Sequence, residues 1–380
     1  MPGIVQTEQR EILRSKSTRS SPSGFGTRSS IMVTSRLDNC VWLTTLGLAT
    51  CCVLVGATSK EIVAFTDGKD DGWKTWDWDA ITVLSFWTAP NDDVRAQAMA
   101  SNVRLFQDSH LPDAKDWIDK DKRKSWVKEK VTQIKQNKLD GIFFDFEGQL
   151  TGEQKKAYTD LAQETSAALT PINASIFICV GARPSYEFRD YDYNGLADAS
   201  EFLFIMGYDA HFWDDYTCVT KGTCSPAEAS VKEIEAGVKE YKAKVPGKKL
   251  VLGLPWYGIR YTRVVFPFNE GEIHYDDVLA VIDTPGRVKH KTLDKESQTW
   301  KIVCDGQCMK GAKGDEIWFD DATTLKPKYK VANDNDLLGV GVFEISDLPL
   351  NDDHARERQD MWNAIANWHG QNNSSMTPTY

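Results

Sequence analysis

Eight short apolar segments, separated by segments with helical periodicity, constrain the fold of this 380-residue chain more than any other feature. Between them, apolar side chains recur every three to four positions, as in helices that bury one face; Val127, Val131 and Ile134 are one such set. Strands that alternate with helices form parallel sheets, and eight such units indicate a (β/α)8 barrel. A doubly wound parallel sheet is the alternative. The predicted strands are residues 62–66, 81–87, 103–107, 141–147, 174–181, 202–209, 250–256 and 339–345.

Two capping boxes mark the predicted starts of helices. Thr151 with Gln154 precedes the helical pattern that runs through Leu161, and Ser225 with Glu228 precedes another. In such a box the first side chain accepts a hydrogen bond from the backbone of the fourth residue, whose own side chain reaches back.

The first 59 residues differ in composition from the rest of the chain. Residues 1–36 are rich in Ser and Arg without apolar periodicity, which is typical of disordered segments. Residues 41–57 are apolar, end in small residues and have Arg36 upstream, which is the pattern of a secretory signal peptide at about 32–59, with Met32 as its natural start. Because the segment is near the minimum length for crossing a bilayer, an uncleaved signal anchor is the alternative.

We expect residues 60–369 to form one domain, with an insertion at about 258–320 and a flexible tail at 370–380. The gap between the seventh and eighth predicted strands is longer than one helix needs, and it contains short mixed segments and Gly-rich turns. An insertion there lies on the C-terminal rim of the barrel, where (β/α)8 enzymes place their active sites.

Charge and cysteine content limit the partners and the compartment. A net charge of −10 argues against nucleic acid or anionic membranes as partners, and we expect a monomer. Cys304 and Cys308, like Cys218 and Cys224, are close enough to close small loops, which indicates an oxidising compartment, secreted or lysosomal. Cys179 lies in an apolar run and is expected to be a buried free thiol. Possible glycosylation acceptors are Asn173, Asn372 and Asn373.

The segment 139–148, LDGIFFDFEG, carries acidic residues within an apolar run. Alternate side chains of a strand share a face, so Phe143, Asp145 and Glu147 point to one side and the intervening apolar residues to the other. Burying a carboxylate is costly unless it is paired or its pKa shifts, so two acids on one buried face indicate a functional site. The alternative is that both acids end the strand and face water.

Residues 140–147, DGIFFDFE, resemble the DGxDxDxE signature of glycoside hydrolase family 18, the chitinase family. Asp140, Asp145 and Glu147 match three of its acids, whereas Phe143 stands where the family has the middle one. Residues 206–209, MGYD, resemble the sixth-strand MxYD motif, which includes Met206, Tyr208 and Asp209.

Two later segments extend the resemblance. Residues 248–261, KKLVLGLPWYGIRY, are similar to the seventh-strand segment of one branch of the family and contain Trp256 and Tyr257. In residues 339–344, GVGVFE, Phe343 stands where the family usually has a Trp under the sugar. The resemblance covers roughly residues 61–368.

The resemblance implies a catalytic role for Glu147, Asp145 and Tyr208. Most glycosidases use two protein carboxyls, but in family 18 the 2-acetamido group of the substrate acts as the nucleophile. Glu147 is then the acid that protonates the glycosidic oxygen, and the charge of Asp145 is expected to favour its protonated form. No segment has the spacing of zinc or calcium ligands, and we expect no metal or other cofactor. The residues expected to bind substrate are Asp140, Phe143, Met206, Asp209, Trp256, Tyr257 and Phe343.

These features favour an enzyme that hydrolyses β-1,4 bonds of N-acetylglucosamine oligosaccharides, such as the chitobiose core of N-linked glycans and chitin oligomers. A chitinase that acts on longer chitin is one alternative. A chitinase-like lectin that binds without cleaving is the other, and family lectins typically lack the acid at the position of Glu147.

Overall fold

The structure, a computed structural model, describes residues 60–67, 71–184, 189–209, 227–263 and 267–368. All of them belong to one compact unit, Ala57–Tyr380. The predicted leader at 1–59, the tail at 370–380 and the cysteine pair Cys218 and Cys224 lie outside the described residues.

Among the described residues, eight parallel strands close a barrel in the order β1-β13-β7-β6-β5-β4-β3-β2. The (β/α)8 fold is therefore confirmed, and all eight predicted strands are present, most of them one to three residues shorter than expected. The strands are β1 (Glu61–Thr66), β2 (Val83–Phe86), β3 (Arg104–Asp108), β4 (Gly141–Asp145), β5 (Ser175–Val180), β6 (Leu203–Met206), β7 (Leu250–Pro255) and β13 (Gly339–Phe343).

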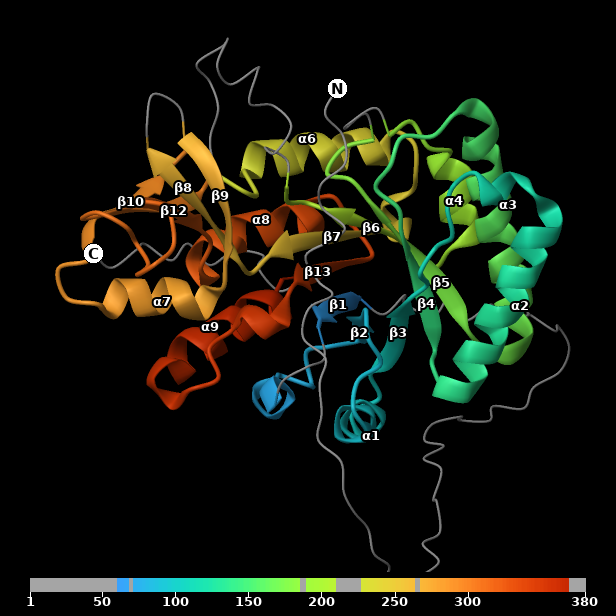
Figure 1. Cartoon of the computed structure of the whole chain (residues 1–380), viewed down its shortest axis with the longest axis horizontal. Helices are drawn as coiled ribbons and strands as arrows, with labels where there is room; N and C mark the ends of the chain where they lie inside the picture. The colour runs from blue at the N-terminus through green and yellow to red at the C-terminus, as the bar shows by residue number, and fades with distance from the viewer. Residues whose placement is uncertain (1–59, 68–70, 185–188, 210–226, 264–266, 369–380) are drawn as a thin grey trace, which may run out of the picture. The chain divides into compact units, whose positions relative to one another are not determined.

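Helices on the outside of the barrel follow most of its strands (Figure 1). The predicted box of Thr151 and Gln154 caps α3, so this prediction is confirmed. The second predicted box does not cap α6, because this helix begins at Val231 with Ser230 as its N-cap; Ser225 lies outside the described residues. The helices are α1 (Asp92–Ala100), α2 (Lys120–Asn137), α3 (Gly152–Leu169), α4 (Tyr193–Ala199), α6 (Val231–Lys242), α8 (Ala322–Asp334) and α9 (Ala355–Ala366).

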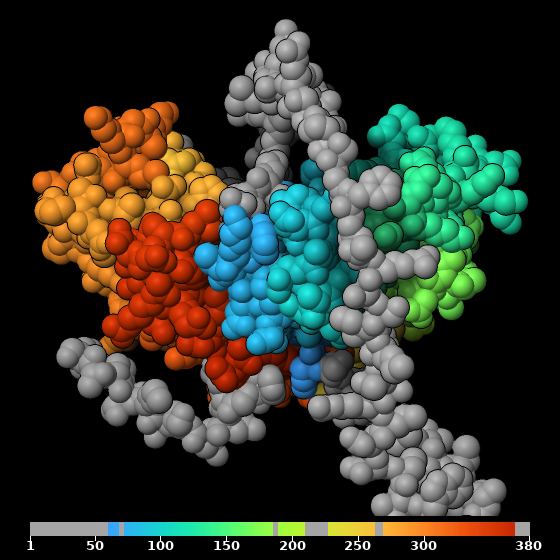
Figure 2. All heavy atoms as spheres, turned by 90° about the horizontal axis from the view of Figure 1, so that it is seen from below, coloured from blue at the N-terminus to red at the C-terminus, as the bar shows by residue number. Residues whose placement is uncertain are grey.

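Barrel closure brings the two ends of the described chain together. β1 pairs with β13 in parallel, with Glu61 opposite Gly339. The Lys60 ammonium donates a hydrogen bond to the carbonyl of Leu337 at 2.8 Å, and it lies 4.9 Å from the ring centroid of Trp368. In Figure 2 the blue first segment and the red last segment accordingly lie against each other.

Side chains that alternate along the strands form two separate apolar cores. Ile142 and Phe144 join the large outer core between strands and helices, whereas Phe143 joins an inner core in the barrel. The predicted alternation along this strand is confirmed. The inner core is mostly aromatic and includes Phe65, Phe106, Phe143, Phe177, Phe202 and Phe204.

Glycines make room for these rings inside the barrel. A Cβ on Gly253 would lie 2.2 Å from the Phe204 ring, and one on Gly341 would lie 2.4 Å from the same ring. The barrel interior is therefore a packed aromatic core and not a channel.

The insertion between β7 and β13 is a second, antiparallel sheet in the order β10-β11-β12-β8-β9, which confirms this part of the predicted fold. The predicted disulfide between Cys304 and Cys308 is also confirmed, and Cys179 is a buried free thiol. The elements are β8 (Gly258–Arg263), β9 (Pro267–Ile273), α7 (Tyr275–Asp283), β10 (Val288–Asp294), β11 (Thr299–Cys304) and β12 (Glu316–Phe319).

A buried ion pair connects the insertion to the barrel. Lys328 of α8 lies 2.5 Å from Asp320, which follows β12, and both side chains are almost completely buried. The Lys328 ammonium also donates to the hydroxyl of Thr299 at 2.9 Å, at the start of β11. Because one cation binds groups from two neighbouring strands, β11 and β12, at the same end of the sheet, the insertion is held against α8.

We predict that Lys328→Met destabilises the protein by about 3–5 kcal/mol, because it leaves the Asp320 carboxylate buried without a counter-ion. The measurement is urea unfolding followed by tryptophan fluorescence. Lys330→Met is the control, since Lys330 pairs with Asp334 on the exposed face of the same helix; it should cost less than about 1 kcal/mol. Equal costs for the two variants would contradict the prediction.

Candidate active site

The C-terminal end of β4 presents two acids from the inner face of the barrel. Asp145 is the last residue of the strand, and Glu147 follows two positions later. Asp145 is half-buried, and its Oδ1 atom is inaccessible to water and has no hydrogen-bond partner. The side chain of Glu147 is 54% exposed. One acid thus faces the interior and the other faces solvent.

Phe143 forms an apolar floor one pleat below Asp145. Its side chain is completely buried, and its ring stacks on Phe177 with centroids 5.2 Å apart and an interplanar angle of 13°. Edge contacts at 5.3 Å to Phe65 and 5.8 Å to Trp87 complete its surroundings. An ionised Asp145 therefore receives no polar contact from below.

Burial raises the pKa of Asp145 to about 7, with the negative charges of Glu147 and Asp108 adding to the rise and Arg189 opposing it. Asp145 is therefore partly protonated near neutral pH. The sequence predicts that Glu147 is the protonated acid. In the structure, burial favours a proton on Asp145.

β6 brings Tyr208 to the same end of the barrel. Met206 and Tyr208 both belong to the inner core, as predicted from the alternation of this strand. Burial raises the pKa of Tyr208 well above its ordinary value, and the nearby charges of Asp145 and Glu147 add to the effect. The phenol therefore stays protonated and can donate a hydrogen bond. Phe343 packs beside it, with ring centroids 5.4 Å apart.

A second carboxyl pair lies next to Tyr208. The Tyr257 hydroxyl donates to Asp209 Oδ1 at 3.0 Å and to Glu228 Oε1 at 3.3 Å. Glu228 also accepts the backbone N–H of Asp209, which has a left-handed φ of 55°. Burial, followed by the charge of Asp209, raises the pKa of Glu228 well above its ordinary value.

Glu228 is one of three polar residues near the site that sequence reasoning missed. It lies between two buried alanines, Ala227 and Ala229, and the sequence assigned it to a capping box and not to the site. Arg189 lies after β5 and contacts Glu147. Asp108 ends β3 and pairs with His110; a polar residue directly after a predicted barrel strand was a usable signal for it.

Two residues predicted to bind substrate lie elsewhere. Asp140 precedes β4, and its Oδ2 accepts the backbone N–H of Leu105 at 2.8 Å, at the opposite end of the strand from Glu147. The Trp256 indole donates to the Tyr329 hydroxyl at 3.1 Å and packs on Trp362 of α9 at 5.1 Å. Both residues thus stabilise the barrel, one by a hydrogen bond and the other by packing. Neither lies at the carboxyl groups of Asp145 and Glu147.

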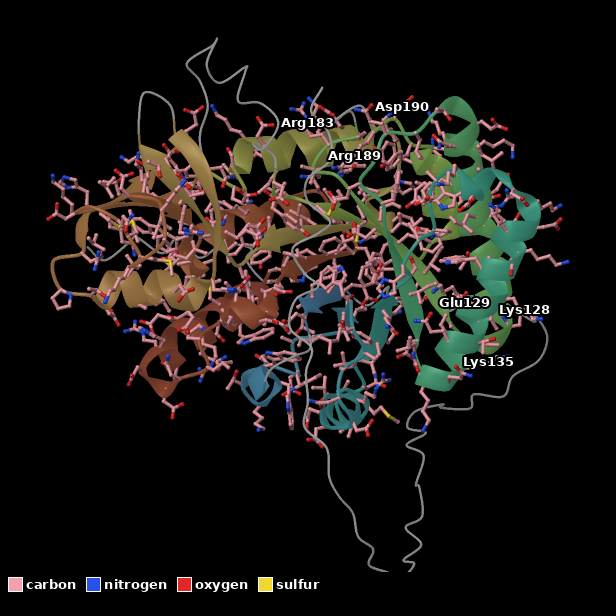
Figure 3. All side chains as sticks on the ribbon, in the orientation of Figure 1. Lys128, Glu129, Lys135, Arg183, Arg189 and Asp190 are labelled. Atoms are coloured by element: carbon pink, nitrogen blue, oxygen red, sulfur yellow. A yellow bond between two sulfur atoms is a disulfide. The ribbon has the colours of Figure 1, made fainter. Side chains whose placement is uncertain are left out.

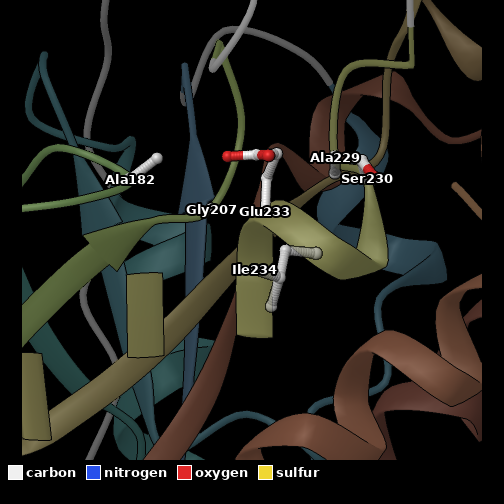
Figure 4. A pocket seen from close by; sticks show the side chains of 6 residues that line it. All are labelled: Ala182, Gly207, Ala229, Ser230, Glu233 and Ile234. Carbon is white, nitrogen blue, oxygen red and sulfur yellow. The ribbon is translucent and has the colours of Figure 1, made fainter. Parts of the chain in front are cut away.

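The pocket in Figure 4 is also distinct from the carboxyls. Its empty volume of about 180 Å³, open solvent included, is below the 300–1,000 Å³ typical of ligand sites. The pocket is lined by Ala182, Gly207, Ala229, Ser230, Glu233 and Ile234.

Within the described part of the chain, no group of three or more His, Cys, Asp or Glu could hold a metal ion.

Comparisons with known proteins agree on one family. A family model described as "Glycosyl hydrolases family 18" matches residues 107–347. Di-N-acetylchitobiase of Mus musculus is 27% identical over 338 residues, which cover 80% of this chain and 87% of that protein. Di-N-acetylchitobiase of Homo sapiens is 27% identical over 333 residues, with coverages of 80% and 83%.

Solved structures show the same fold. The crystal structure of a chitinase from Chromobacterium violaceum ATCC 12472 superposes with a TM-score of 0.65 at 16% identity, covering 83% of this chain and 100% of that one. At this level of identity the likeness concerns the fold alone.

The raised pKa of Asp145 predicts how stability changes with pH. Unfolding lowers its pKa from about 7 to about 4, so the folded state holds the proton more tightly between these values and loses stability as pH rises through them. Asp145→Asn should therefore be more stable than the wild type at pH 8, by a few kcal/mol at most, since one pKa unit corresponds to about 1.4 kcal/mol. At pH 4 the two should be nearly equal.

Thermal unfolding between pH 4 and pH 8 measures this difference. Asp190→Asn is the control, because Lys155 holds the pKa of this exposed acid below its usual range, so its removal has the opposite sign. A wild type whose stability does not fall between pH 5 and pH 8 relative to Asp145→Asn would contradict the prediction.

Proposed function

The chain belongs to the glycosyl hydrolases of family 18, and we propose that it cleaves β-1,4 bonds next to N-acetylglucosamine by a retaining mechanism in which the substrate supplies the nucleophile. The observation that carries the proposal is the solvent-exposed Glu147 beside the half-buried Asp145, whose Oδ1 atom has no hydrogen-bond partner, at the C-terminal end of the barrel. Relatives named di-N-acetylchitobiase, matched over most of their length, support chitobiose-type oligosaccharides as the substrate class.

The first step transfers one proton and closes one ring. Glu147 gives its proton to the glycosidic oxygen while the carbonyl oxygen of the 2-acetamido group attacks the anomeric carbon. The bond between that carbon and the leaving oxygen breaks, and an oxazolinium ion forms. Glu147, now ionised, then removes a proton from the water that opens the ring, so the original configuration is kept.

Asp145 and Tyr208 act on the acetamido group. Asp145 accepts a hydrogen bond from the acetamido N–H and stabilises the positive charge of the oxazolinium ion in its ionised form. The apolar surroundings of Asp145 strengthen this interaction, because the local dielectric constant is low. Tyr208 donates a hydrogen bond that orients the carbonyl oxygen for attack, which its raised pKa allows at all working pH values.

Aromatic and acidic side chains at the rim form the rest of the proposed sugar site. The half-buried Phe343 offers an apolar face next to Tyr208, over the inner core that contains Phe143 and Met206. Asp209 and Tyr257, which are linked by their hydrogen bond, offer polar contacts to sugar hydroxyls. Asp140 and Trp256 are not part of this site.

We further propose that the protein works outside the cytosol, in the lysosome or after secretion, once the leader at about 32–59 is removed. The disulfide between Cys304 and Cys308 supports an oxidising compartment. Among the helices formed by the described residues, none is long and apolar enough to cross a membrane.

Glu147→Gln should lower kcat by 10²-fold or more with little change in folding, because it removes the transferable proton and keeps the shape of the side chain. Chitobiose and long chitin are each incubated with purified protein, and products are separated by chromatography. Glu153→Gln, an exposed acid in the first turn of α3, is the control and should keep full activity. A wild type that binds these sugars without releasing N-acetylglucosamine would instead indicate a lectin.

Dependence on the acetamido group tests the mechanism separately. Substrates with a hydroxyl or free amine at C2 should be turned over negligibly, because they cannot form the oxazolinium ring. A thiazoline analogue of that ring should inhibit, and Tyr208→Phe should lower kcat more than it raises KM. Efficient cleavage of a 2-hydroxy substrate, or a sugar trapped covalently on a protein carboxylate, would refute substrate assistance.

A further inference from the structure

A buried arginine contacts the proposed acid, and the mechanism above gives it no role. Arg189 lies between β5 and α4, and its side chain is only 7% exposed. Its Nη2 donates a hydrogen bond to Glu147 Oε2 at 3.2 Å. A buried guanidinium at this distance favours the ionised form of a carboxyl, whereas a general acid must be protonated.

The residues that follow Arg189 fix both partners of this contact. The Tyr191 hydroxyl donates to the carbonyl oxygens of Phe146 at 3.1 Å and Gly148 at 2.6 Å, the residues on either side of Glu147. The carbonyl of Arg189 accepts the Tyr191 N–H at 3.0 Å and the Tyr193 hydroxyl at 2.5 Å. The segment from Arg189 to Tyr193 therefore binds the backbone of Glu147 as well as its side chain.

The groups that face the two acids come from several elements. Asp108 at the end of β3 adds negative charge, and Arg189 is the cation that opposes it at Asp145. Burial raises the pKa values of Cys179, Tyr158 and Tyr208 well above their ordinary ranges, so these three stay neutral. The presence of a proton on Asp145 thus depends chiefly on burial of this acid and on the charge of Arg189.

We propose that Asp145 and Glu147 share one proton and that Arg189 is a positioning residue that decides which of them holds it. It keeps Glu147 ionised and leaves the proton on Asp145 until a glycosidic oxygen approaches Glu147. The contact between Arg189 and Glu147 then breaks, and the proton moves from Asp145 to Glu147 and on to the leaving oxygen. Asp145 becomes an anion as the oxazolinium charge forms beside it.

This inference deepens the proposed function and rests on it for the step to the leaving oxygen. The distribution of the proton between the two carboxyls is a property of the protein alone. It is therefore open to measurement with and without turnover.

The first test is the pH dependence of kcat/KM with chitobiose from pH 4 to pH 9. Arg189→Gln removes the charge that holds Glu147 ionised, so the alkaline limb should move up by about one pH unit or more. Arg189→Lys keeps a cation and should retain the wild-type limb. A purely structural role would lower kcat at every pH without moving the limb, and that result would overturn the proposal.

Arg183 is the matched control in this region of the chain. Like Arg189, which is labelled beside it in Figure 3, it follows β5. It pairs instead with Glu240 and Glu233 of α6. Arg183→Gln removes a salt-bridged arginine from the same segment between β5 and α4. It should leave the alkaline limb of the kcat/KM profile unchanged. Tyr191→Phe keeps the charge and loosens the backbone at Glu147, so it should lower kcat without a shift of the limb.

The second test needs no turnover. The pH range over which thermal stability falls should move upward in Arg189→Gln relative to the wild type. In a protein that already carries Glu147→Gln, the shift caused by Arg189→Gln should be at least halved, because the carboxylate that Arg189 contacts is absent. Arg189→Met, which fills the same buried space, replaces the Gln variant if that variant does not fold.

The two tests separate this inference from the proposed function. If the wild type does not hydrolyse chitobiose but the stability profile shifts, the proposed function fails and the role of Arg189 at the carboxyls holds. If the wild type hydrolyses chitobiose and neither the kcat/KM profile nor the stability profile moves in Arg189→Gln or Arg189→Met, the role of Arg189 is refuted and the function holds.

Discussion

Packing of aromatic rings inside the barrel is the constraint on which the candidate site depends. Phe204 fills the centre because Gly253 and Gly341 leave it room, and Phe143 stacks on Phe177 below the strand ends. A carboxyl at the next inward position, Asp145, then lies over hydrocarbon and has no polar group beneath it. Close packing of the core thus creates the low dielectric environment that raises the pKa of this acid.

Neutral hydrogen-bond donors lie at the rim that carries this acid, and a cation opposes the charge of its acids. The phenols of Tyr208 and Tyr257 remain protonated because burial disfavours their anions. Arg189 supplies positive charge to a rim that also carries Asp108 and Glu147.

The sequence predicts what depends on periodicity and local chemistry. Alternation placed Phe143 and Asp145 on the inner face, and Thr151 with Gln154 located the start of α3. The sequence could not predict pairs of side chains that come into contact only when the barrel closes. Arg189 and Glu147 are 42 positions apart, and the Tyr257 hydroxyl reaches Glu228 across 29.

Resemblance to the family motifs also did not distinguish residues that stabilise the fold from residues at the site. Asp140 and Trp256 belong to the matching segments, yet one accepts a backbone N–H of β3 and the other packs among the outer helices. Strand alternation explains Trp256, since the next residue, Tyr257, faces the site. A motif contains structural residues beside functional ones, and only the side to which each side chain points distinguishes them.

Closure of the barrel by β1 and β13 has a consequence for synthesis of the chain. The closing contact joins Lys60 to Leu337, which are 277 positions apart. At the usual rate of translation the first strand waits on the order of 15–55 s for its partner. Until β13 is made, β1 has an unpaired edge, and β7 has one from the time it is synthesised. Unpaired strand edges favour pairing with another chain, so the partly made protein carries this risk until β13 leaves the ribosome.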